Sequence, residues 1–230
     1  MGRLFPSGRN QLYGTIDSPV LMTIDWITSH IIEITGAVTG IIYVLLEIKQ
    51  KIWLWPLGIV TSSFYVVVFF QSGFYADMGL QFYYLFISVY GWYWWLKGRS
   101  SSDSGSLKVT NIKKRGLFFS LLLFLVLFAL IWVILASFTD SQLPGWDSFT
   151  TALAIVATWM LARKYIEHWY LWMVANTVSI GLYIFKELYP TVILFAVYTV
   201  MSFVGYMAWK RSMQEEESTN SLKAQTLKYE

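Results

Sequence analysis

Three side chains that could bind a small polar molecule lie close together in the segment EHWYLWMVANTVS, residues 167–179. Trp169 and Trp172 are three residues apart, and Asn176 follows four residues after the second tryptophan. On an α-helix this spacing brings the three side chains to one face, because residues three and four apart are neighbours. Indole rings attract flat or cationic groups, and an amide both donates and accepts hydrogen bonds. The segment therefore predicts a binding face for a flat, polar molecule.

Three further apolar segments carry a similar face of aromatic, hydroxyl and amide side chains. Ser179 continues the first face at helical spacing. The remaining candidates for contact with the bound molecule are Trp55 and Ser62, Gln81 and Tyr84, and Tyr198. No Lys or Arg lies in the middle of these segments, so a phosphate group would have no cationic partner there. The pattern predicts a cage that favours a nucleoside-like solute over a nucleotide.

The same residues also fit structural roles. Trp55 and Trp169 lie near the ends of apolar segments, where tryptophan is enriched as a membrane-interface anchor. Serines and glycines commonly pack helices together, and GAVTG at 36–40 has that small-xxx-small spacing. Asn176 and Gln81 point to function more strongly, since hydrogen bonding between helices is the main other use of an amide at such a position.

Titratable groups are scarce in the apolar segments. His30 and Glu33, three residues apart in the first segment, are the one titratable pair that we expect near membrane depth. They predict a gating or proton-linked role, although His30 at the outer interface and Glu33 bonded to a neighbouring helix would also explain them. The chain has no cysteine, no His/Asp/Glu metal constellation and no Ser-His-Asp set. We therefore expect no metal, no cofactor and no enzyme activity.

Composition identifies an integral membrane protein. Hydrophobic residues make up 56% of the 230 residues and charged residues only 13%, about half the usual share. Segments of about 20 apolar residues cross a bilayer as helices. The seven predicted spans are 26–46, 52–71, 78–96, 116–138, 148–162, 169–186 and 190–209, with Trp146 extending the short fifth span. The net charge of +3 is spread between these spans, so nucleic-acid binding is not indicated.

The distribution of basic residues predicts the orientation. Of the 17 Lys and Arg, three lie on the side of the N-terminus: Arg3, Arg9 and Lys186. The other fourteen lie on the opposite side, six of them in the 97–115 loop. Because positive loops stay in the cytoplasm, we expect the N-terminus outside and the C-terminus in the cytoplasm.

The chain also repeats itself at an offset of 114 residues. Residues 36–95 and 150–209, the first and second repeat units, align without a gap and share about eleven identical positions, among them Trp55/Trp169, Ser88/Ser202, Gly91/Gly205 and Trp95/Trp209. Three spans invert the chain and a fourth inverts it again, so we expect a 3+1+3 parallel repeat with the substrate between the halves. The predicted parts are an extracytoplasmic segment, a three-helix bundle, a basic cytoplasmic loop with a linker helix, a second three-helix bundle and a cytoplasmic polar tail, at 1–25, 26–97, 98–145, 146–210 and 211–230.

With these motifs the sequence resembles the PnuC family of bacterial vitamin-precursor transporters. The resemblance rests on RKYIEHWYLWMVANTVS, with the family's WxxWxxxN pattern at Trp169, Trp172 and Asn176, and on WDS at 146–148. In the first repeat unit Gly58 and Ser62 replace the second Trp and the Asn. The two units are therefore expected to contribute unequally to the site.

The resemblance implies an all-α, SWEET-like fold in the bacterial cytoplasmic membrane, in contact with lipid. It also implies facilitated diffusion of nicotinamide riboside by alternating access, with trapping by a separate cytoplasmic riboside kinase. Thiamine or riboflavin transport remains an alternative, and so does a structural or assembly role. The sequence leaves the oligomeric state open, a homo-oligomer included.

Overall fold

The computed structural model describes residues 35–72, 75–101 and 107–226. Within these residues the chain forms seven helices, the first of which covers Thr35–Ile48. The others are α2 (Leu54–Ser72), α3 (Tyr75–Ser101), α4 (Lys114–Phe138), α5 (Pro144–Ala162), α6 (His168–Phe185) and α7 (Tyr189–Thr226). The all-helical prediction is confirmed for the described residues, and each of the last six predicted spans coincides with one helix. His30, Glu33 and the predicted segment 1–25 lie outside the described residues.

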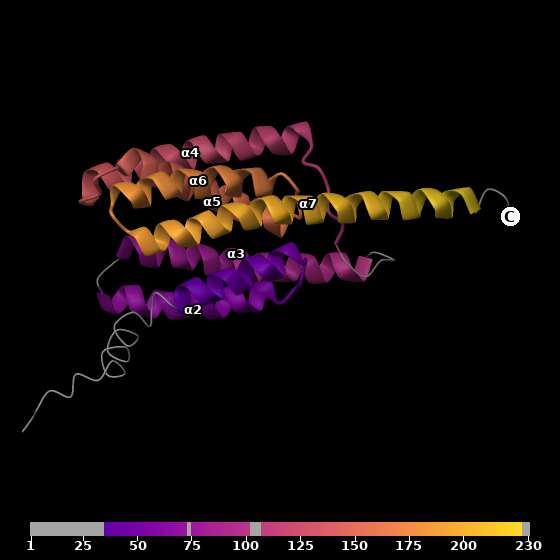
Figure 1. Cartoon of the computed structure of the whole chain (residues 1–230), viewed down its shortest axis with the longest axis horizontal. Helices are drawn as coiled ribbons and strands as arrows, with labels where there is room; N and C mark the ends of the chain where they lie inside the picture. Colours follow the sequence, from indigo (N-terminus) through magenta and orange to yellow (C-terminus); the bar gives the residue numbers. More distant parts are fainter. Residues whose placement is uncertain (1–34, 73–74, 102–106, 227–230) are drawn as a thin grey trace, which may run out of the picture. The chain divides into compact units, whose positions relative to one another are not determined.

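Two helices extend well beyond the C-terminal ends of the spans predicted for them. α3 continues to Ser101, and α7 continues to Thr226 as a polar helix that projects past the other helices in Figure 1. Apolar composition predicts only the part of a helix that lies in the membrane, whereas the polar continuation is stabilised by pairs such as Arg211–Glu215, at 2.9 Å and one turn apart. α5 begins four residues before its predicted span, at Pro144, which suits the first helical position.

Large apolar side chains cover much of the outer surface. α4 has one buried residue, Ser120, while Leu117, Phe118, Leu122, Leu125, Val126, Leu130 and Val133 on it are at least half exposed. α4 and the Tyr189–Thr219 part of α7 are each long and apolar enough to cross a membrane. An apolar exterior of this extent is typical of helices that face lipid.

Residues 39–230 pack as one compact unit. Helix α2 packs on α3, α6 packs on α7, and α5 contacts α3, α4 and α6. In Figure 1 these helices run along a common direction, with α4 at the edge of the bundle. The core therefore lies among α2, α3, α5, α6 and α7, and α4 contributes little to it.

The two turns that precede α2 and α6 have the same backbone hydrogen bonds at the offset of 114 residues. In the first turn Gln50 N donates to Glu47 O at 2.9 Å and Lys51 N to Leu46 O at 2.8 Å. In the second turn Lys164 N donates to Leu161 O at 2.9 Å and Tyr165 N to Met160 O at 3.0 Å. Gln50 and Lys164 both take a left-handed conformation, with φ of 52° and 55°, which ends the preceding helix. The end of the bundle that carries residues 46–55 and 160–169 is called the turn end here.

Candidate functional site

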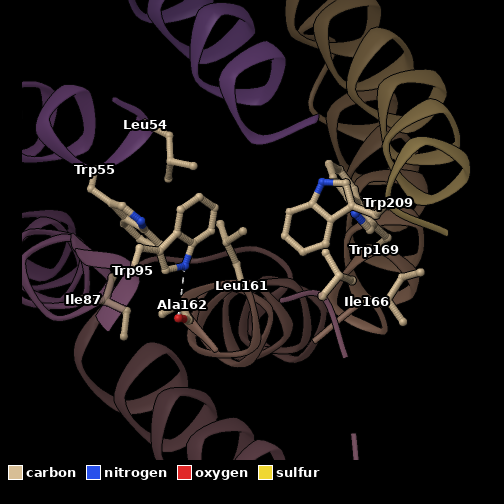
Figure 2. Close-up of a cluster of buried hydrophobic side chains, with 10 residues drawn as sticks. Leu54, Trp55, Ile87, Trp95, Leu161, Ala162, Ile166, Trp169 and Trp209 are labelled. Atoms are coloured by element: carbon tan, nitrogen blue, oxygen red, sulfur yellow. Dashed lines mark hydrogen bonds between the residues drawn. The ribbon is translucent and has the colours of Figure 1, made fainter. Parts of the chain in front are cut away.

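Four tryptophans, two from each repeat unit, fill the core at the turn end. Figure 2 shows Trp55 beside Trp95, and Trp169 beside Trp209. Both pairs meet edge to face, at ring-centre distances of 5.5 and 5.8 Å and interplanar angles of 88° and 87°. Edge-to-face contact places the positive ring edge on the negative face and is favoured over a flat sandwich. The two pairs give the turn end a dense aromatic core.

Glycines on the neighbouring helices make room for two of these indoles. A Cβ atom added to Gly91 would lie 2.4 Å from the ring of Trp55, and one added to Gly205 would lie 2.3 Å from the ring of Trp169. Both rings are fully buried, and both indole N–H groups have no hydrogen-bond partner among the described residues. Trp55 and Trp169 thus pack against helix backbone, and a substrate contact by either one stays a prediction.

Asn176 joins α6 to α7 through a buried hydrogen bond. Its Nδ2 donates to Ser202 Oγ at 3.3 Å, and Ser202 Oγ donates to the carbonyl oxygen of Tyr198 at 2.8 Å. Asn176 and Ser202 are both buried, so the amide is removed from lipid. Asn176 is therefore linked through Ser202 to the backbone of α7 at Tyr198, another predicted site residue.

Trp172 lies one turn before Asn176 on α6 and packs against the aromatic core of the turn end. The side chain is partly buried, and its Nε1 atom is fully buried with no acceptor among the described residues. A buried N–H without a partner costs roughly 1–3 kcal/mol. The missing acceptor is therefore a feature that a polar ligand would supply.

The other predicted site residues are spread over α2, α3, α6 and α7. Ser62 on α2 and Ser179 on α6 are buried, and Gln81 on α3 is partly buried. Tyr84 packs against the aromatic core and meets Tyr83 edge to face at 5.5 Å. The hydroxyl of Tyr198 lies so close to Gly40 that a Cβ atom there would collide with it. Contact of these residues with a substrate stays a prediction.

A buried contact between a carboxyl group and an imidazole lies at the turn end and was not predicted from the sequence. His168 Nε2 lies 3.0 Å from Glu47 Oε1, and the two side chains are 0% and 3% exposed. Each of the two residues lies one position outside a predicted span, where charged residues are common. One signal was present: at the offset of 114 residues Glu47 aligns with Leu161 and His168 with Leu54, so the two charged positions depart from the repeat.

Lys164 holds the neighbouring loops against the turn end. Its Nζ donates to Gln50 Oε1 at 2.9 Å and to the carbonyl of Leu107 at 2.8 Å, and it lies 4.5 Å from the ring centre of Trp95. Burial lowers the pKa of Lys164 to about 8, while the carboxylate of Glu216 acts in the opposite direction. Glu167 adds a second link by accepting the backbone N–H of Ile112. The loop after α3 is thereby fixed to the turn before α6.

A bundle of apolar helices with a lipid-facing exterior and buried amides and hydroxyls inside is the architecture of a multi-pass membrane transporter. The chain belongs to the nicotinamide mononucleotide transporter family, whose model matches residues 30–211. This is a family of membrane transporters and not of enzymes. The resemblance noted from the WxxWxxxN motif is confirmed.

Curated relatives from different bacteria match most of the chain. The nicotinamide riboside transporter PnuC of Escherichia coli K12 is 25% identical over 211 residues, which cover 81% of this chain and 88% of the relative. The riboflavin/roseoflavin transporter RibM of Streptomyces davaonensis is 25% identical over 160 residues, covering 66% of this chain and 73% of the relative. The family scaffold therefore occurs in proteins named for different vitamins.

A solved structure has the same fold. The crystal structure of the vitamin B3 transporter PnuC matches with a TM-score of 0.65 and 23% identity, covering 85% of this chain and 87% of the other. The similarity extends the fold assignment to nearly the whole bundle.

Proposed function

We propose that this chain carries nicotinamide riboside across the bacterial cytoplasmic membrane by facilitated diffusion. The observation that carries the proposal is the partly buried ring of Trp172, whose Nε1–H has no acceptor among the described residues, one turn before the buried amide of Asn176. Nicotinamide riboside has a flat pyridinium cation for the indole face, and a carboxamide and ribose hydroxyls for the two polar groups. The name of the Escherichia coli relative supports the choice of substrate.

The charge distribution supports a nucleoside over a nucleotide. Among the described residues, the buried acidic and basic side chains, histidine included, are Glu47, Lys164 and His168, all at the turn end. Asn176 is eight residues beyond His168, about 12 Å along the helix. A phosphate group beside Asn176 would therefore be buried without a cation, which is costly.

Alternating access between the two repeat units accounts for how the substrate crosses. The matching turns and the paired Trp–Gly contacts support the proposed 3+1+3 parallel, SWEET-like arrangement of residues 26–97 and 146–210 around the linker helix. The excess of basic residues supports a cytoplasmic turn end, an outward N-terminus and a cytoplasmic C-terminal tail. A separate cytoplasmic kinase that phosphorylates the riboside would trap it inside the cell.

Equilibrium binding to purified protein tests the substrate. We expect nicotinamide riboside to bind at least about tenfold more tightly than its 5′-phosphate, a difference of about 1.4 kcal/mol. The affinity for thiamine, another cationic vitamin, is measured in the same way to test the alternative substrate. Equal affinity for the riboside and its phosphate would place the site at the basic loops and not beside Asn176. Tighter binding of thiamine would identify thiamine as the substrate in place of nicotinamide riboside.

A further inference from the structure

Hydrogen bonds join the two repeat units to each other at the turn end. Trp209 Nε1, in the second unit, donates to the carbonyl of Glu47 in the first at 3.0 Å. Trp95 Nε1, in the first unit, donates to the carbonyl of Ala162 in the second at 3.2 Å, the bond drawn in Figure 2. Trp95 and Trp209 are equivalent positions of the repeat. Each repeat unit therefore donates one neutral indole hydrogen bond to the other unit.

The Glu47–His168 contact joins the same two units and has no counterpart. His168 Nδ1 lies 2.6 Å from the carbonyl oxygen of Tyr165, which can only accept, so Nδ1 carries a hydrogen. The 3.0 Å contact between Nε2 and Glu47 Oε1 then holds a second hydrogen between ring and carboxyl group. At the equivalent positions the chain has Leu54 and Leu161, both fully buried in the aromatic core.

A polar pair and a leucine pair at this position respond differently when the repeat units separate. Water can hydrate the carboxyl group and the imidazole ring, so the polar pair is satisfied both when it is closed and when it is open. A leucine pair loses its burial on opening, which costs free energy in proportion to the apolar area exposed. A buried polar pair at this position therefore makes the contact between the units easier to reverse.

We propose that Glu47 and His168 form a reversible latch between the two repeat units, which separates when the carrier opens at its turn end. The proposal rests on the alternating access put forward above. The latch explains why the two units match in their indole bonds and differ at these two positions. Glu47 and His168 thereby influence the rate of transport without contacting the substrate.

The test is the double variant Glu47→Leu/His168→Leu, which gives this position the residues already present in the other unit. Replacing both partners of a buried pair with apolar residues is often neutral for stability, whereas removing one is not. A single cysteine at Ser202, next to Asn176, reports access to the site; the chain has no other cysteine, so labelling has no background. We expect a membrane-impermeant maleimide applied from the turn-end side to react about tenfold more slowly than in the Ser202→Cys parent, and the rate from the opposite side not to fall.

Trp95→Phe is the matched control, because it removes a neutral bond between the same units. It should loosen the turn end and raise the labelling rate from that side, the opposite change. If the double variant does not assemble, Glu47→Met/His168→Met replaces it, because this variant is also apolar at both positions and its flexible side chains pack more adaptably, with a smaller fall expected. Unchanged labelling from the turn-end side in the leucine variant, or in the methionine variant where it replaces that variant, would overturn the latch. Labelling uses no vitamin, so the result stands apart from the identity of the substrate.

Discussion

Trp172→Ala should weaken the binding of nicotinamide riboside about thirtyfold. In a desolvated site a cation above an indole face contributes roughly 2 kcal/mol, and that difference corresponds to about thirtyfold in affinity. Trp172 has the required environment, because its ring packs against the aromatic core and its buried Nε1 has no acceptor among the described residues. Isothermal titration calorimetry on purified protein measures the effect.

Two variants separate stacking from other consequences of losing an indole. Trp172→Phe keeps a weaker π face and should recover much of the affinity, though not the hydrogen bond of Nε1. Trp53→Ala removes a tryptophan that is 69% exposed, and it should leave the dissociation constant unchanged. If Trp172→Ala folds and binds like the parent protein, the indole serves helix packing and the substrate lies elsewhere.

Asn176→Leu should reduce riboside affinity by roughly 1–3 kcal/mol, or about five- to 150-fold. Leucine is similar in size, so the loss comes from burying a polar group of the substrate without a partner. The variant also removes the hydrogen bond to Ser202 Oγ, and a small fall in melting temperature is expected on that account. Binding is measured on protein that elutes as the parent does in size-exclusion chromatography.

Ser202→Ala is the control for Asn176, because it removes the same hydrogen bond between α6 and α7 but keeps the amide. It should lower the melting temperature by a similar amount and leave most of the affinity. Equal losses of affinity in the two variants would mean that the amide holds the helices together and does not contact the substrate.

Much of the fold could be predicted from the sequence because the membrane imposes a strong constraint on apolar length. Each span from 52–71 onward coincides with a helix, and the turns at Gln50 and Lys164 match at the offset that the sequence repeat predicts. The polar continuation of α7 from Lys210 to Thr226 was not predicted as helix, since hydropathy reports burial in lipid and not helix propensity.

The contacts of the site were less predictable, because spacing fixes a helix face and not its neighbour. The predicted face grouped Trp169 with Trp172, yet the ring of Trp169 is fully buried against Gly205, whereas the ring of Trp172 is only partly buried. Glu47 and His168 are 121 residues apart, and only the tertiary fold, which places the end of the first helix beside the start of α6, brings them within 3.0 Å. Pair contacts of this kind need the tertiary structure.

The most direct test is uptake into liposomes that contain only the purified protein, with the same pH and salt on both sides. We expect labelled nicotinamide riboside to enter until the concentrations are equal, and the mononucleotide to stay at the level of protein-free liposomes. Facilitated diffusion of a nucleoside predicts both results, since it needs no ion gradient and, among the described residues, no buried cation lies beside Asn176. Accumulation above the outside concentration when a proton gradient is applied, or entry of the mononucleotide as fast as the riboside, would contradict the account.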